Sequence, residues 1–249
     1  MQTLARFFML SMLVLIAARC AHDPDHPSQI HHPEGYGPQH YAVAHQTPGG
    51  VPMPPSVPHR FTQAEEWAKV FDDPTREAWQ KPSEVVAAMR IQPGMTVVDL
   101  GAGTGYFLPH LDRAVGPQGR VVALDVEANL VGYMQARITK ENLAVTRAQL
   151  VSPTDTGLEA ASVDRILIVD TWHHITDRQQ YARKLKRSLR KSGAIFIVDF
   201  APELGGPGPK VEDRISAQTV QRELVAAGYK VQILEESLPY QYIVRARQP

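Results

Sequence analysis

A glycine-rich turn after an apolar run carries the clearest chemical signal in the sequence. Val97 and Val98 lead into Asp99, and glycine then recurs at positions 101, 103 and 105. Residues without a Cβ at such a turn let the backbone approach a ligand closely. An apolar strand, a glycine-rich turn and a following helix together are typical of a loop that binds a nucleotide or a related ligand. The turn therefore predicts a binding site where this strand ends.

An acidic residue follows at the distance that nucleoside-binding folds use. Asp125 ends the next apolar run, twenty residues after Gly105. A carboxylate at this position can accept hydrogen bonds from both hydroxyl groups of a ribose. Asp125 can also cap the helix that we expect from Glu127, and the two roles are compatible. The ligand should therefore contain a nucleoside.

Two classes of nucleoside ligand compete for this loop. The dinucleotide fingerprint G-x-G-x-x-G, started at Gly101, requires glycine at position 106, where the sequence has Tyr106. The pattern from Asp99 to Gly105, D-x-G-x-G-x-G, instead resembles motif I of the class I S-adenosylmethionine-dependent methyltransferases. The likeness extends over about residues 80–247. An acid close to the loop suits the ammonium group of that methyl donor, whereas it would repel a pyrophosphate.

The resemblance implies a role for each part of the loop and makes S-adenosylmethionine the expected cofactor. The residues that would line its methionine and ribose parts are Gly101, Ala102, Gly103 and Gly105. Asp99 would lie near the ammonium group. Asp170, after a later strand, would also contact the cofactor.

The same resemblance implies which residues would contact the adenosine part of the cofactor. Asp125 would bind the ribose hydroxyls, and Val126 would flank the adenine. The acid that often meets the adenine amine in this family falls at Ser152 in this sequence. Ser152, the backbone near Pro153 or the side chain of Asp155 would then take that role.

Polar residues after the apolar run 163–169 mark the acceptor side. Asp170, His173 and His174 follow this run, and ligands of open parallel sheets bind beyond the carboxyl ends of the strands. These three residues are the catalytic candidates, since a histidine near neutrality can remove a proton from a methyl acceptor. The sequence does not separate His173 from His174. Asp199 ends the next apolar run and either orients an acceptor or caps its loop.

Short apolar runs alternate with helical stretches after Gly94, and this pattern sets the fold class. We expect strands at residues 96–100, 120–125, 143–150, 163–170 and 194–200. We expect helices at residues 107–115, 127–139, 178–190 and 211–227. The alternation predicts an α/β fold with a doubly wound, mostly parallel seven-stranded sheet and helices on both faces. The last two runs, 229–235 and 240–247, are close enough to form a hairpin, so the terminal strand should be antiparallel.

A helical segment precedes the first strand. Trp67, Phe71 and Trp79 recur at helical spacing, and the step Asp72-Asp73-Pro74 should break one helix and cap the next. In the resembling enzymes such helices cover the methyl donor and shape the acceptor site. We therefore expect a methyltransferase domain over residues 61–249 with an N-terminal helical cap at residues 61–92.

The first sixty residues have a different composition. Arg6 precedes an apolar run over residues 7–18, which fits a secretory signal over residues 1–20. Cys20 follows as in a bacterial lipoprotein signal, although Arg19 departs from the small residue typical there. Residues 21–60 are rich in proline and histidine and predict a disordered linker. These features predict an exported, periplasmic or membrane-anchored protein with a membrane tether at its N-terminus, whereas a start at Met53 would make it cytoplasmic.

Charge and cysteine content narrow the function classes. Lys+Arg and Asp+Glu both number 26, so no net charge attracts the chain to nucleic acid. One cysteine excludes an internal disulfide and a cysteine-based zinc site, and we expect no metal. We expect methyl transfer to a small-molecule acceptor. The alternatives are an exported protein that binds a nucleoside ligand without catalysis and a nicotinamide oxidoreductase, which Tyr106 and the terminal hairpin disfavour.

Overall fold

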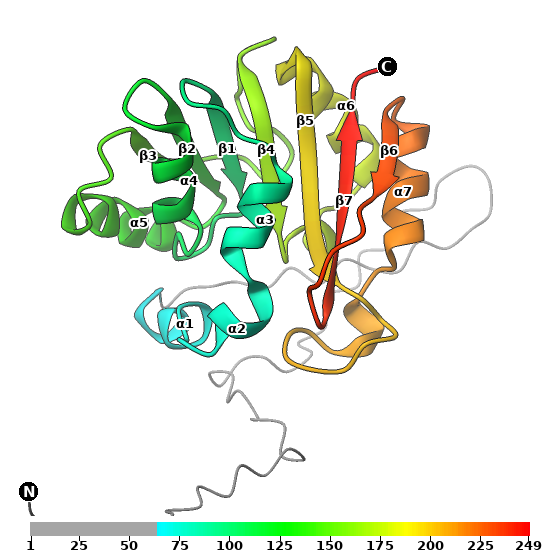
Figure 1. The fold of residues 1–249 in the computed structure, drawn as a ribbon, viewed down its shortest axis with the longest axis horizontal. Coiled ribbons are helices and arrows are strands. Elements are labelled where there is room, and N and C mark those ends of the chain that lie inside the picture. The colour runs from blue at the N-terminus through cyan, green and yellow to red at the C-terminus, as the bar shows by residue number, and fades with distance from the viewer. Residues whose placement is uncertain (1–63) are drawn as a thin grey trace, which may run out of the picture.

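A single seven-stranded sheet organises the chain in the computed structural model, which describes residues 64–249 (Figure 1). The predictions for residues 1–60 lie outside this range. The strand order is β3-β2-β1-β4-β5-β7-β6. The strands are β1 (Thr96–Leu100), β2 (Arg120–Asp125), β3 (Thr146–Leu150), β4 (Val163–Val169), β5 (Leu189–Phe200), β6 (Lys230–Ile233) and β7 (Gln241–Arg247).

The strand directions confirm the predicted fold class. β3, β2, β1, β4 and β5 pair in parallel with their neighbours. β7 lies between β5 and β6 and pairs antiparallel with both. The short connection between the last two runs requires the antiparallel pairing of β6 with β7. The carboxyl ends of the five parallel strands therefore meet along one edge of the sheet, where ligands bind in such folds.

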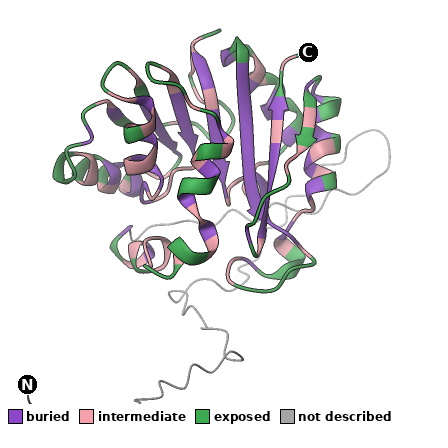
Figure 2. Cartoon of the chain, viewed as in Figure 1, coloured by how far each residue is buried: buried purple, intermediate pink, exposed green. Residues whose placement is uncertain are grey.

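Helices cover both faces of the sheet and bury it (Figures 1 and 2). On one face α3 (Pro82–Ala88), α4 (Leu108–Val115) and α5 (Ala128–Lys140) pack on the strands. On the other face lie α6 (Arg178–Ser188) and α7 (Ala217–Ala226). β4 is buried at nearly every position, as its unbroken apolar run predicts for a strand covered on both sides.

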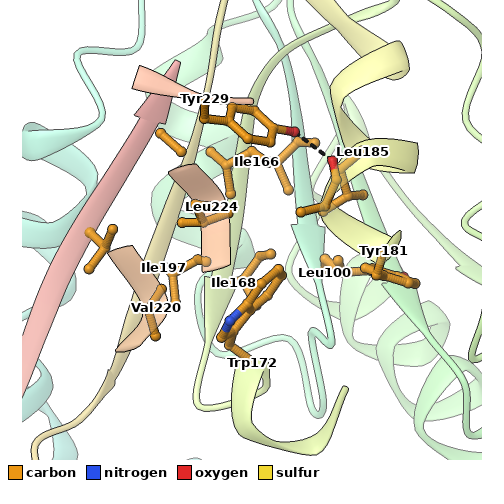
Figure 3. Packing of buried hydrophobic residues seen from close by; sticks show 14 of the residues in the cluster. Leu100, Ile166, Ile168, Trp172, Tyr181, Leu185, Ile197, Val220, Leu224 and Tyr229 are labelled. Atoms are coloured by element: carbon orange, nitrogen blue, oxygen red, sulfur yellow. Dashed lines mark hydrogen bonds between the residues drawn. The ribbon is translucent and has the colours of Figure 1, made fainter. Parts of the chain in front are cut away.

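The hydrophobic core between the sheet and helices α6 and α7 includes the buried ring of Tyr229 (Figure 3). Ile166, Ile168 and Ile197 of the sheet pack against Leu185 of α6 and Leu224 of α7, and all five are buried. Tyr229 donates a hydrogen bond from its hydroxyl to the carbonyl oxygen of Ala182, 2.8 Å away. This bond satisfies the polar end of a side chain whose ring fills the core.

Several predicted boundaries differ from the structure. β3 begins at Thr146 rather than 143, and β5 begins at Leu189, which pairs with Val163, so residues 189–190 are strand rather than helix. No glycine or proline marks the end of α6, and the pairing with β4 decides it. α7 begins at Ala217, because Ser216 caps it by accepting from the Thr219 N–H, and Val211–Asp213 form a separate 3₁₀ turn.

The helical cap contains three helices, one more than a single break predicts. α1 (Ala64–Phe71) ends at the predicted step, and Asp73 accepts a 2.8 Å hydrogen bond from the Thr75 N–H before α2 (Arg76–Gln80). Lys81 then adopts a positive φ of 46° and separates α2 from α3. Figure 1 shows α1 and α2 beneath the carboxyl ends of the parallel strands. The cap thus covers the edge where the glycine loop lies.

Candidate cofactor and acceptor site

A cavity of about 640 Å³ lies between the glycine loop, the carboxyl ends of β1, β2 and β4, and the cap. Phe71 and Arg76 of the cap form part of its wall. Among the sequence-predicted residues, those that line it are Asp99, Gly101, Ala102, Gly103, Asp125, Val126, Asp170 and His174. Gly105, Ser152 and His173 are not in the lining. The structure therefore brings most of the predicted site into one hollow.

The three glycines of the loop serve different purposes. Gly101 has a φ of 72°, and a Cβ there would collide with the side chain of Thr171, so this glycine lets the turns after β1 and β4 approach each other. Gly105 packs on α4, where an added Cβ would lie 2.7 Å from Leu108 Cδ1. Gly103, with a φ of 59°, faces the cavity, and its added Cβ would come no closer than 3.6 Å to Phe71. Of the three glycines, Gly101 and Gly103 line the cavity and Gly105 does not.

Asp125 fixes the loop and keeps acceptor capacity for a ligand. Its Oδ2 accepts a 2.9 Å hydrogen bond from the Gly103 N–H, and its Oδ1 accepts a 3.0 Å bond from the Glu127 N–H. Burial raises the pKa of Asp125, while these backbone hydrogen bonds act in the opposite direction. Each carboxylate oxygen can accept a second hydrogen bond. Two neighbouring acceptors of this kind suit the two hydroxyl groups of a ribose.

An apolar recess adjoins Asp125 at the ends of β2 and β3. Val126, Leu130, Val151 and Pro153 line it. Ser152 lies between two of these residues, but its side chain is exposed and its Oγ accepts a 3.2 Å hydrogen bond from the Thr154 N–H. Apolar side chains beside a carboxylate suit an adenine ring, and Val151 and Pro153 line the cavity whereas Ser152 does not.

The opposite end of the cavity is strongly charged. Burial raises the pKa of Asp99 to about 7, and Arg76 opposes this shift. Burial likewise raises the pKa of Asp170 to about 7, with Arg76 again opposing it. Asp170 has a positive φ of 49°, which is uncommon outside glycine and holds its carboxyl at the cavity. Two buried carboxyl groups near one guanidinium suit a ligand with a positive charge.

Polar contacts join the cap to the glycine loop. Asp72, just after α1, accepts hydrogen bonds from Thr104 Oγ1 at 3.0 Å and from Arg137 at 2.9 Å. Arg137 also donates to the Thr104 carbonyl oxygen at 3.3 Å. Tyr106 donates from its hydroxyl to Glu77 of α2 at 3.0 Å. Residues at the C-terminal end of the loop and Arg137 of α5 therefore hold the cap over the cavity.

The turn after β4 separates the two candidate histidines. Trp172 is buried, and its Nε1 donates to Glu223 of α7 at 3.0 Å, which anchors the turn. His173 is buried beside it, and its Nδ1 donates to Asp199 at 2.9 Å. Burial lowers the pKa of His173, but the Asp199 carboxylate outweighs this and raises it. His173 Nε2 has no hydrogen-bond partner among residues 64–249.

His174 is the histidine that reaches the cavity. It lines the hollow next to Ile175 and Thr176, and its ring centroid lies 4.0 Å from that of His173. His174 therefore packs against the imidazole ring of His173, and a hydrogen bond to Asp199 holds that ring in place. The structure thus assigns different positions to two residues that spacing could not distinguish, and it places Asp199 behind the histidines rather than in the cavity wall.

Some residues of the site were not predicted individually from the sequence, although Arg76 lies in the helical cap that was expected to cover the methyl donor. Arg76 and Thr171 line the cavity, and Gln241 contacts Asp170 from the terminal hairpin. Thr171 is the second residue after β4, so its position at a strand end was a usable signal. Arg76 and Gln241 reach the site only through the packing of the cap and β7, and no local spacing indicates this.

The cavity fits S-adenosylmethionine by the chemistry of its donors and acceptors. The cavity offers the Asp125 carboxylate to a ribose diol, apolar side chains to a base and the carboxyl groups of Asp99 and Asp170 to a cationic group. No group of three His, Cys, Asp or Glu side chains in the described range could hold a metal ion. No helix within residues 64–249 is long and apolar enough to cross a membrane.

Comparisons with known proteins agree with this assignment. Residues 91–238 match the family described as the methyltransferase domain, and the chain belongs to this family. The match supports the predicted class of enzyme and the predicted cofactor, S-adenosylmethionine. An S-adenosylmethionine-dependent methyltransferase from Aquifex aeolicus shares 30% identity at a TM-score of 0.69, covering 72% of this chain and 96% of that one.

More distant relatives share parts of the chain. A ubiquinone/menaquinone biosynthesis C-methyltransferase of Vibrio campbellii is 28% identical over 139 residues, 54% of this chain and 53% of the relative. A geranyl diphosphate C-methyltransferase from Streptomyces coelicolor A3(2), at 15% identity and a TM-score of 0.57, shares the fold over 74% of this chain and 84% of its own. The chain spans about half the length of the curated C-methyltransferase that it matches.

Proposed function

We propose that this protein transfers a methyl group from S-adenosylmethionine to a small-molecule acceptor bound beside His174. The observation that carries the proposal is the continuous cavity from Asp125, through the glycine loop, to Asp170 and His174. When bound, S-adenosylmethionine supplies a methyl group on a positively charged sulfur. Asp125 would hold the ribose, and the carboxyl groups of Asp99 and Asp170 would face the cationic end.

The protein's part in the reaction is mainly alignment. S-adenosylmethionine would supply the methyl carbon, with sulfur as the leaving group that keeps the electron pair, and this chain would hold the acceptor atom in line with that carbon–sulfur bond. A site that holds donor and acceptor in line lowers the barrier without further covalent chemistry. Where the acceptor loses a proton, that proton passes to an imidazole nitrogen of His174. His173 and Asp199 position this ring and do not touch the acceptor.

A binding experiment tests the cofactor assignment. The full chain is titrated by calorimetry with S-adenosylmethionine, S-adenosylhomocysteine and NADH. We expect the first two to bind and NADH not to bind, because no glycine stands at position 106 and the acid Asp99 lies beside the loop. Tighter binding of NADH would overturn the assignment.

A second experiment separates catalysis from binding alone. The full chain is incubated with S-adenosylmethionine labelled in its methyl group and a bacterial metabolite extract, and transfer of the label to small molecules is measured. We expect transfer by the wild type and its loss in His174→Ala, while this variant keeps its affinity for S-adenosylhomocysteine. Binding of the cofactor without any transfer would favour the non-catalytic alternative.

We also propose that the protein is exported and tethered by its N-terminal segment. The apolar run before Cys20 and the proline-rich stretch after it support this. In such a protein the stretch to residue 60 would act as a spacer between the membrane and the methyltransferase domain.

A further inference from the structure

We propose that Arg76 of the cap binds the α-carboxylate of the cofactor's methionine part, so that the cofactor site is complete only with the cap in place. The inference rests on the proposed function, because it assigns a partner to one group of the same cofactor. It concerns a residue outside the glycine loop, on a helix that precedes the first strand.

The charges in the cavity single out Arg76. Among the described residues that line the cavity, it is the one arginine, and none is a lysine. Asp99 and Asp170 lie at its end of the hollow, where their charges act on Arg76. An amino-acid group carries both an ammonium and a carboxylate. The two aspartates offer partners to the ammonium, and the carboxylate needs a cation or N–H donors that the aspartates cannot supply.

Arg76 is held rigidly but keeps donors for a ligand. Its Nε and Nη2 donate to Gln80 Oε1 at 3.3 and 3.0 Å, and its Nη1 donates to the Phe71 carbonyl oxygen at 2.7 Å. The ring of Tyr106 lies 4.2 Å from the guanidinium carbon and supports one side. A guanidinium has five N–H donors, so about two are left after these contacts. A planar fork of this kind is well suited to a carboxylate.

Asp170 interacts with Arg76 electrostatically but does not accept a direct hydrogen bond from it. The nearest contact, from Arg76 Nη2 to Asp170 Oδ2, is 3.8 Å, which is beyond hydrogen-bond distance. Gln241 instead donates to Asp170 Oδ1 at 2.6 Å, and Gln80 donates to Gln241 in turn. Both glutamines are buried. The four side chains thus form a network that fixes the guanidinium and the carboxyl near each other without joining them directly.

The charge balance of this end agrees with the assignment. With Asp99 and Asp170 ionised, the three groups carry a net charge of about −1. The methionine part of S-adenosylmethionine carries an ammonium, a carboxylate and a sulfonium, so it balances this charge. After methyl transfer the sulfur is uncharged, so the end of the cavity with Asp99, Asp170 and Arg76 has a net negative charge again. A site of this composition therefore holds the methyl donor more favourably than the product.

A comparison of two ligands tests the proposal in the wild type. S-adenosylhomocysteine and S-adenosyl-3-thiopropylamine differ in the α-carboxylate, which the second lacks while it keeps the amine. We expect the full chain to bind S-adenosylhomocysteine roughly tenfold or more tightly, the value of one charge-assisted interaction. Equal affinities would overturn the inference and leave the proposed function intact. Failure of both ligands to bind would instead count against the proposed function itself.

Variants of Arg76 separate ligand binding from support of the cap. We expect Arg76→Met to weaken S-adenosylhomocysteine roughly tenfold or more and to change the affinity for the thiopropylamine ligand less than about threefold. Arg137→Met is the matched control, since Arg137 joins the cap to the loop from outside the cavity lining, and it should weaken both ligands alike. Equal losses for both ligands in Arg76→Met would show that Arg76 only supports the cap. If Arg76→Met fails to fold, Arg76→Lys is measured with the same two ligands. We expect this variant to prefer S-adenosylhomocysteine over the thiopropylamine ligand less strongly than the wild type does.

Discussion

Replacing Asp125 by asparagine tests the part of the site on which the cofactor assignment depends. Each carboxylate oxygen of Asp125 already accepts one backbone hydrogen bond, from Gly103 and from Glu127. An asparagine keeps one acceptor oxygen and turns the other into a donor, which then faces a backbone N–H. The variant loses the negative charge and at least one ribose contact. Charge-assisted hydrogen bonds contribute about 1.5–3 kcal/mol each, so we expect a loss of about 3 kcal/mol, on the order of a hundredfold in Kd.

The fold should tolerate this change. Burial raises the pKa of Asp125, so the folded chain does not favour its charged form, and an uncharged side chain of the same shape removes that cost. The variant loses one hydrogen bond at the loop, which is worth about 1 kcal/mol. These effects oppose each other, so the thermal midpoint without ligand should change little.

Calorimetry with S-adenosylhomocysteine measures the effect, and Asp112→Asn is the matched control. Asp112 also accepts from a backbone N–H and a second group, Val145 N at 3.2 Å and Thr146 Oγ1 at 2.7 Å, but it does not line the cavity. The control should bind the ligand like the wild type. A folded Asp125→Asn variant with an affinity within about threefold of the wild type would refute the ribose assignment.

Three further predictions concern pH, the loop and the N-terminus. Burial raises the pKa values of Asp99 and Asp170 to about 7, and the charge of Arg76 opposes both shifts. Asp125 also raises the pKa of Asp99, whereas Asp199 raises and His173 lowers that of Asp170. Affinity for cationic S-adenosylmethionine should therefore rise from pH 6 to 8 with release of protons, which calorimetry in buffers of different ionisation enthalpy detects, and a flat profile would contradict this. Because the folded chain keeps protons that the unfolded chain releases near pH 4, these two groups should also make the ligand-free protein less stable as the pH rises from about 4 to 7. Gly101→Ala should lower the free energy of unfolding by about 1–3 kcal/mol, since its Cβ meets Thr171 at a positive φ, and an unchanged denaturant midpoint would argue against that close approach. Mass spectrometry of the native N-terminus should find a lipidated Cys20 or a terminus near Ala21, and a chain that starts at Met53 would refute export.

The parallel half of the sheet could be predicted because its signals are local. The run before Asp99, the glycines and Asp125 lie within two consecutive strand–turn–helix units, and each element is specified by its own sequence. The contact between Gly103 and Asp125 spans only 22 positions. The C-terminal end of α6 and the start of β5 could not be predicted in the same way, because pairing of Leu189 with Val163 competes there with a helical pattern.

The other half of the site depends on contacts between distant segments. Arg76 comes from the cap, Asp170 from the end of β4 and Gln241 from the terminal hairpin, and only the closed sheet brings them together. No spacing in the sequence encodes such a meeting. The same reason explains why His173 and His174 were indistinguishable until the packing of Trp172 and the bond to Asp199 set the orientation of their turn.

The two groups of site residues, those from local motifs and those from distant segments, bear differently on the choice of acceptor. The groups that we propose for the cofactor's adenosine lie on the glycine loop and at the ends of β2 and β3, whereas those proposed for the reacting end lie on the cap, the turn after β4 and the hairpin. Substitutions in the second set can change the acceptor without disturbing the first. Identity of 28% over 139 residues with a C-methyltransferase therefore supports a common cofactor far more than a common acceptor. The acceptor must be sought by the label-transfer experiment, in which His174→Ala should abolish transfer to every acceptor, whereas substitution of Ile175 or Thr176 beside it should alter which molecules are methylated.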